Sequence, residues 1–147
     1  MCIRDRFRET LKNLPTDVAI FNAAVADFKV KEINSEKIKK SENLDLKLEK
    51  NIDILSNISN HNSLRPKITI GFAAESQNLE LNSKKKLDQK NCDWIIANDI
   101  SDKTIGFDSD DNEVSIFYKN KKSEKLSKKS KSLIASEIVD RVISELN

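Results

Sequence analysis

A carboxylate followed by a group of lysines is the first feature of this sequence that could do chemistry. The small apolar run 23–26 ends at Asp27, and Lys37, Lys39 and Lys40 come shortly afterwards. Lysine is a mobile point charge that suits phosphate groups. A carboxylate placed beside several lysines could hold Mg²⁺ that bridges a polyphosphate. The pattern therefore predicts a binding site for a nucleoside triphosphate.

Two further lysines support the same chemistry. Lys86 and Lys90 are four positions apart, so they share one face if their segment is helical. The plain alternative for each of these lysines is a solvated surface side chain, because the chain contains 26 Lys and Arg residues. Gly71 and Gly106 are the two glycines, so neither a GxGxxG fingerprint nor a P-loop is present. A nucleotide site in this chain must therefore be built without a glycine-rich loop.

Three apolar segments, each predicted to be a buried strand, position these groups. They cover residues 17–26, 67–75 and 93–100, and each runs into polar or acidic residues. Helical patterns from about Asn51 and over 79–91 separate the strands, which predicts a parallel sheet with crossover helices. Ligands of open parallel sheets bind beyond the carboxyl ends of the strands. One run of small residues would be ordinary packing, but three at the same edge of a sheet favour a site.

The C-terminal third completes the predicted architecture. Residues 113–119 read as a strand, and the turn at 120–123 leads into an antiparallel partner. A helix over 131–146 carries an apolar stripe. The fold class is therefore α/β, a Rossmann-like three-layer fold with a mostly parallel sheet, a C-terminal antiparallel strand or hairpin and a terminal helix, in one domain over 1–147. The stripe consists of Leu133, Ile134, Ile138, Val142 and Leu146.

Composition excludes several classes of function. A formal net charge of +2 gives no clear basic excess, so we expect no nucleic-acid partner. No apolar run reaches the length of a membrane span, so we expect no membrane partner. Cys2 and Cys92 have no metal-binding spacing, and a reducing, cytoplasmic setting is expected. Cys92 is interpreted as a core residue, and His61, the sole histidine, as a surface residue rather than a catalyst.

The motifs, taken in order, resemble phosphopantothenoylcysteine synthetase, usually the C-terminal half of the bacterial bifunctional coenzyme A biosynthesis protein. The resemblance runs from about Asp17 to the C-terminus. It implies ligation of 4′-phosphopantothenate to L-cysteine with CTP and Mg²⁺, through an acyl-cytidylate. It also implies a homodimer, and fusion to or pairing with a phosphopantothenoylcysteine decarboxylase. The motifs that carry it are AAVADF, SEKIKK, NIDIL, GFAAES, KKKLDQKNCDWIIANDIS and GFDSDDNEV.

The resemblance also implies roles for individual residues. Lys37 matches a CTP-site lysine that assists formation of the acyl-cytidylate, where a cation would stabilise charge gathering on the phosphates. Asp27 matches an aspartate of the CTP site and is the candidate Mg²⁺ ligand. Asn98 belongs to the AND motif at the sheet edge and is a further candidate for the site. The remaining positions that would contact CTP are Ile52, Asp53, Ile54, Leu55, Phe72, Lys86 and Lys90, with Ile52 standing where the family usually has proline.

One departure from the family lies at the N-terminal end. The glycine-rich strand–loop–helix and the asparagine segment of the family are not found upstream of Phe7, where a partial helix, FRETLKNL, begins. We therefore expect an N-terminally incomplete synthetase domain, with residues 1–6 interpreted as non-native. We also expect weak CTP binding, no ligation product from residues 1–147 alone, and no FMN site.

Two other functions stay open. A non-catalytic nucleotide-binding or assembly module would keep the fold without the reaction. A Rossmann-like enzyme that uses a dinucleotide is disfavoured because the glycine fingerprint is missing.

Overall fold

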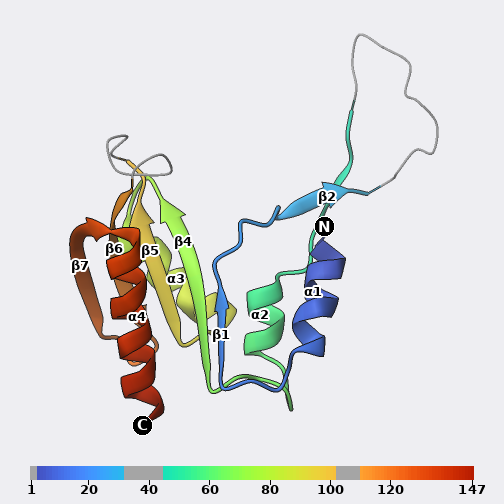
Figure 1. Cartoon of the computed structure of the whole chain (residues 1–147). Coiled ribbons are helices and arrows are strands. Elements are labelled where there is room, and N and C mark those ends of the chain that lie inside the picture. Colours follow the sequence, from blue (N-terminus) through green and yellow to red (C-terminus); the bar gives the residue numbers. More distant parts are fainter. Residues whose placement is uncertain (1–2, 32–44, 102–109) are drawn as a thin grey trace.

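The computed structural model describes residues 3–31, 45–101 and 110–147 and places a five-stranded sheet at the centre of the molecule (Figure 1). The first three strands in sheet order are mutually parallel, and the last two are antiparallel to their neighbours. This arrangement confirms the predicted mostly parallel sheet with a C-terminal hairpin. In spatial order the strands are β1 (Val18–Phe21), β4 (Ile68–Glu75), β5 (Trp94–Asp99), β6 (Asp111–Tyr118) and β7 (Ser123–Ser130).

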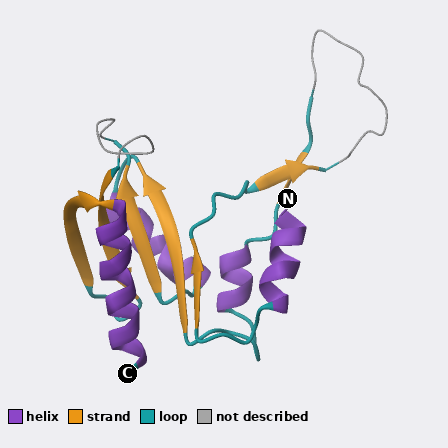
Figure 2. Ribbon diagram, viewed as in Figure 1, coloured by secondary structure: helices purple, strands orange, loops and turns teal. Residues whose placement is uncertain are grey.

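Helices cover both faces of this sheet, which gives the three layers of the predicted α/β fold (Figure 2). Alternate residues of β5 explain the layers: Trp94 and Ile96 pack in the core under α4, whereas Ile95 and Ala97 pack with α2 and α3. No helix in the described ranges is both long and apolar enough to cross a membrane. The helices are α1 (Ile3–Lys12), α2 (Ile54–Ser59), α3 (Leu79–Lys90) and α4 (Lys131–Leu146).

The first predicted strand is shorter and more exposed than expected. The strand predicted over 17–26 is observed as β1, which ends at Phe21, and the chain leaves the sheet after it. Within the described sheet β1 pairs with β4 alone, and Ile20 is 46% exposed. The prediction of a buried strand over 17–26 was wrong here, because an apolar sequence does not reveal whether a strand has a neighbour at one edge or at both.

A second, two-stranded sheet was not predicted. It pairs β2 (Phe28–Val30) with β3 (Leu48–Lys50) in antiparallel fashion and stands apart from the main sheet (Figure 1). Each strand has only three residues, and their sequence separation is long. Alternation over three residues is too short a pattern to predict a strand.

The terminal helix packs with part of its predicted stripe. Ile134, Ile138 and Val142 are buried against the sheet, as predicted. Leu133 is 57% exposed because it lies about 100° round the helix from Ile134. Leu146, the final helical residue, is also exposed, so these two were wrongly included in the buried stripe.

A charge contact also ties α4 to β7. Arg141 donates to both carboxylate oxygens of Glu124 at 2.8 Å each, and the Tyr118 hydroxyl donates to the same carboxylate. These contacts, led by the Arg141 hydrogen bond, lower the pKa of Glu124 below its ordinary value. The paired carboxylate therefore stabilises the fold above its unfolded-state pKa, and that contribution is lost as the pH falls through the lower folded-state pKa.

Gly71 allows α2 to approach β4 closely. A Cβ atom at this position would lie 2.4 Å from Leu55 Cδ2 and 2.9 Å from Ile95 Cδ1. We expect Gly71→Ala to lower the free energy of unfolding by about 1–3 kcal/mol, the usual cost of overpacking a core. Urea unfolding followed by circular dichroism measures this loss. Ala74→Ser, at an exposed position of the same strand, should change it by less than about 0.5 kcal/mol; equal losses would contradict the packing argument.

Candidate functional site

A cavity of about 940 Å³ lies beside β1 and the segment that follows it, with α1, α2 and α3 contributing to its wall. It contains both signs of charge and an aromatic side chain, because Asp27, Lys86, Lys90 and Phe72 all line it. These residues are far apart in the sequence and are brought together by the crossover connections of the sheet. The predicted CTP-contacting positions that line the cavity are Asp27, Asp53, Ile54, Leu55, Phe72, Lys86 and Lys90. Their roles toward a nucleotide stay predictions.

Three predicted positions are not placed in this cavity. Lys37 lies outside the described residues. Ile52 is exposed and does not line the wall. Asn98 also does not line it, because the two-residue repeat of β5 places Asn98 on the same face as Trp94 and Ile96, which pack under α4.

Asp27 is held at the cavity by the segment that precedes α2. The backbone N–H of Asn51 donates to the Asp27 carbonyl at 2.8 Å, and Asn51 Nδ2 donates to the Ala26 carbonyl at 2.8 Å. The Asp27 residue is exposed, so its carboxylate is accessible to a ligand. The two chain segments thus fix each other at the mouth of the site.

Asp53 joins two helices through one carboxylate. Its Oδ1 accepts the N–H of Ser56 at 2.9 Å and caps α2, and its Oδ2 accepts Lys90 Nζ at 2.7 Å. The helix predicted from about Asn51 therefore begins later, at Ile54. The N–H of Ser56, in its first turn, already has the Asp53 carboxylate as an acceptor. An incoming phosphate would compete with Asp53 for Lys90, because both side chains line the cavity.

Lys86 is held by a different kind of partner. Its Nζ lies 2.6 Å from Glu75 Oε1, and Glu75 Oε2 accepts Asn82 Nδ2 at 3.1 Å. The Glu75 side chain is only 12% exposed and does not line the cavity, whereas Lys86 does. Lys86 therefore lines the cavity while its ammonium group pairs with a mostly buried carboxylate.

The cavity wall also contains residues that the sequence interpretation did not name, among them Gln89 and Arg6. Gln89 follows Lys86 by three positions on α3, so the helical spacing could have identified it. Arg6 lines the cavity from α1, within the segment interpreted as non-native on composition. Composition carries no information on where a side chain lies, so no signal in the sequence pointed to Arg6.

Neither Cys92 nor His61 lines this cavity. Cys92 is fully buried, and burial raises the pKa of its thiol to about 11, so it stays protonated near neutral pH, as its interpretation as a core residue requires. His61 Nδ1 accepts the N–H groups of Ser63 and Leu64 in the turn after α2. The His61 ring therefore stabilises the turn that follows α2.

Comparison with known families identifies the group to which this fold and cavity correspond. The model of the family described as "DNA/pantothenate metabolism flavoprotein C-terminal domain" matches residues 3–146. The chain belongs to this family. The family assignment confirms the resemblance to the C-terminal half of the bifunctional coenzyme A biosynthesis proteins.

Curated relatives in this family are similar to the chain in sequence. The chain is 45% identical over 122 residues to the coenzyme A biosynthesis bifunctional protein CoaBC of Haemophilus influenzae, which covers 82% of the chain and 30% of that protein. It is 38% identical over 128 residues to CoaBC of Bacillus subtilis, covering 86% of the chain and 31% of that protein. The chain thus spans about a third of the length of these relatives.

Solved structures share its fold. The C-terminal domain of a CoaBC protein superposes with a TM-score of 0.73 at 28% identity, over 98% of the chain and 62% of that structure. A DNA/pantothenate metabolism flavoprotein from Streptococcus pneumoniae superposes with a TM-score of 0.75 at 22% identity, over 100% of the chain and 69% of that structure, which supports the fold alone.

Proposed function

We propose that this chain carries the CTP-binding portion of a phosphopantothenate–cysteine ligase that acts in coenzyme A biosynthesis. The observation that carries the proposal is the cavity: seven positions that the family resemblance assigns to CTP come from separate segments and line one space. The family membership of residues 3–146 and the names of the curated relatives support the same function.

The proposed reaction has two steps. The carboxylate of 4′-phosphopantothenate attacks the α-phosphorus of CTP, the bond to the β-phosphate oxygen breaks, and pyrophosphate leaves. The amine of L-cysteine then attacks the acyl carbon of the acyl-cytidylate, the bond to the CMP oxygen breaks, and the amine loses a proton. Lys86, Lys90 and Lys37 would stabilise the negative charge of the phosphates during the first step.

The residues present fit Mg²⁺ in the company of a polyphosphate. Asp27 and Asp53 both line the cavity, and Mg²⁺ in nucleotide sites is typically held by one or two carboxylates together with phosphate oxygens. No group of three or more His, Cys, Asp or Glu side chains converges in the described part of the chain, so no site built from protein ligands alone is indicated there. Bound there, Mg²⁺ would neutralise phosphate charge, and Asp27 is the proposed ligand.

The remaining proposals follow from the family. The substrates would be 4′-phosphopantothenate, L-cysteine and CTP, and the active assembly would be a cytoplasmic homodimer. The ligase would be fused to or paired with a phosphopantothenoylcysteine decarboxylase.

We expect CTP to support ligation much better than ATP. The test uses residues 1–147, alone and fused behind the preceding segment of the Haemophilus influenzae relative, of which the chain covers 30%. Pyrophosphate release and phosphopantothenoylcysteine formation are followed with CTP or ATP in the presence of Mg²⁺. Equal rates with the two nucleotides would contradict the assignment. Binding of CTP without pyrophosphate release in either protein would favour a non-catalytic nucleotide-binding or assembly module, and binding of NADH in preference to CTP would favour a dinucleotide enzyme.

A further inference from the structure

Glu75 is a mostly buried carboxylate at the end of a central strand of the sheet. It is the last residue of β4, at the carboxyl end of the sheet, and its carbonyl accepts the N–H of Ile100, which follows β5. Its side chain is mostly buried and contacts α3 rather than the cavity. A buried carboxylate is stable only when it is paired and hydrogen-bonded.

Both oxygens of Glu75 are engaged by one face of α3. Oε1 contacts Lys86 Nζ at 2.6 Å, and Oε2 accepts Asn82 Nδ2 at 3.1 Å. Asn82 and Lys86 are one helical turn apart, so the carboxylate spans two successive turns. The Asn82 amide is itself oriented, because Nδ2 also donates to the carbonyl of Gln77 at 2.9 Å.

The contact leaves Lys86 able to bind an anion. An ammonium group has three donors, so Lys86 can keep its contact with Glu75 and still donate into the cavity. Moving Lys86 away would leave a buried carboxylate with a neutral amide as its one remaining side-chain partner among the described residues. Lys90 differs, because its partner Asp53 lines the cavity and competes for the same donors.

We propose that Glu75, oriented by Asn82, is a positioning residue that holds the Lys86 ammonium group at the cavity so that it contacts the phosphates of the nucleotide. This inference rests on the proposed nucleotide function. Two effects of the carboxylate oppose each other, since it orients Lys86 but also repels phosphate. Its charge is neutralised at 2.6 Å by Lys86 itself and lies behind the cavity wall, so the orienting effect prevails.

Glu75→Gln removes the charge at constant shape and tests the proposal. A glutamine has one acceptor end and one donor end, so it cannot present an oxygen to Lys86 and to Asn82 at the same time. We expect the Kd for CTP, measured by NMR titration of residues 1–147 with Mg²⁺, to rise about tenfold, the usual scale for one charge-assisted hydrogen bond. The Kd for cytidine, which has no phosphate, should stay unchanged. Asn82→Ala, which leaves both charges in place, should raise the Kd for CTP by a smaller factor.

A double-mutant cycle shows whether Glu75 acts through Lys86. In a Lys86→Gln background, Glu75→Gln should weaken CTP binding no further. The matched control is Glu80→Gln, which removes the 2.5 Å contact with Lys84 on the same helix, where the Glu80 side chain is 68% exposed. This control should leave the Kd unchanged.

The outcomes separate the inference from the function on which it rests. If the wild-type chain binds CTP and Glu75→Gln binds it equally well or more tightly, the positioning role is overturned while the nucleotide function stands. Equal weakening of CTP and cytidine by Glu75→Gln, or full additivity with Lys86→Gln, would reduce Glu75 to a structural residue. A wild-type chain that binds no nucleoside triphosphate, alone or in the fusion protein, overturns both.

Discussion

Replacing Lys37 by glutamine should slow formation of the acyl-cytidylate on the order of 100-fold, the effect of removing one preorganised electrostatic donor. Negative charge shifts onto the phosphates as the carboxylate attacks, and a cation near them lowers the barrier. The cavity already holds Lys86 and Lys90, each in contact with a carboxylate. Lys37 would add positive charge to a site whose two described lysines are largely neutralised by their own partners.

The measurement is the single-turnover rate of pyrophosphate release with CTP, Mg²⁺ and 4′-phosphopantothenate in the fusion protein described above. Lys128→Gln is the matched control, because Lys128 is exposed on β7, at the far edge of the sheet from β1. The control should keep the wild-type rate. If both variants react at the same rate, Lys37 is an ordinary surface lysine.

The central elements of the fold could be predicted because each has a long, regular pattern. The strands β4 and β5 are continuous apolar runs, and Ile134, Ile138 and Val142 mark the buried face of α4. The elements that were missed or misjudged depend on partners distant in sequence. The strand β1 pairs with β4 only over Val18–Phe21 although β4 continues to Glu75, and β2 and β3 pair with each other.

Part of the cavity lining could be predicted, but the contacts of its residues could not. The positions of Asp27, Phe72, Lys86 and Lys90 follow from motifs, and the fold places all four on one cavity. The ion pairs of Lys86 and Lys90 join residues that are 11 and 37 positions apart in the sequence. No local sequence pattern specifies contacts over such separations. The sequence patterns therefore did not indicate an ion-pair partner for either lysine. In the structure each lysine contacts a carboxylate, and Glu75 is more buried than Asp53.

This difference decides what a phosphate ligand must displace. At Lys90 such a ligand would replace the half-exposed Asp53, which could be rehydrated or could turn to Mg²⁺. At Lys86 the mostly buried Glu75 would stay in place and the ligand would use the remaining donors. We therefore expect added salt to weaken the ion pair of Lys90 with Asp53 more than that of Lys86 with Glu75, because exposed pairs are screened more than buried ones.

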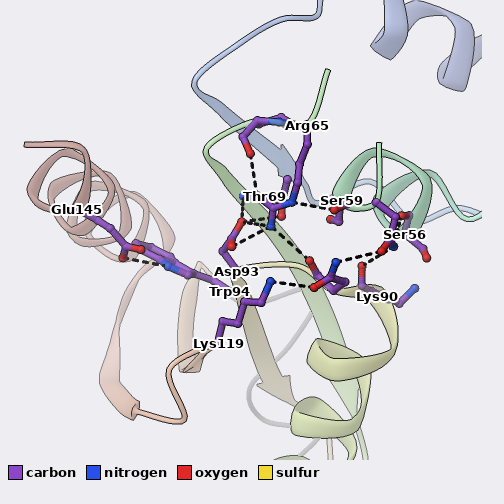
Figure 3. A network of polar contacts seen from close by, with 12 residues as sticks. Ser56, Ser59, Arg65, Thr69, Lys90, Asp93, Trp94, Lys119 and Glu145 are labelled. Carbon is purple, nitrogen blue, oxygen red and sulfur yellow. Dashed lines mark hydrogen bonds and ion pairs between the residues drawn. The ribbon is translucent and has the colours of Figure 1, made fainter. Parts of the chain in front are cut away.

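A second charge network holds the opposite end of the sheet (Figure 3). Arg65, in the loop between α2 and β4, donates to both oxygens of Asp93 at 2.9 Å and to the Ser59 carbonyl at 2.7 Å. Asp93 Oδ2 also accepts the N–H and hydroxyl of Thr69, at 2.7 and 2.9 Å. The Arg65 and Asp93 side chains are 26% and 18% exposed. One carboxylate thus joins the starts of β4 and β5 to the loop that leaves α2.

Asp93→Ala should therefore lower the free energy of unfolding by about 3 kcal/mol, the lower end of the cost of breaking a buried ion pair. The loss has two sources: Arg65 keeps a charge with no carboxylate to receive it, and the buried Thr69 loses the acceptor for its hydroxyl. Urea unfolding followed by the fluorescence of Trp94, the sole tryptophan, measures it. Asp88→Ala removes the exposed pair with Lys121 and should cost less than about 1 kcal/mol. Because Asp53 caps α2 and contacts Lys90, loosening the loop behind α2 should also weaken CTP binding. Similar stabilities of the Asp93 and Asp88 variants would mean that this end of the sheet is held by apolar packing alone.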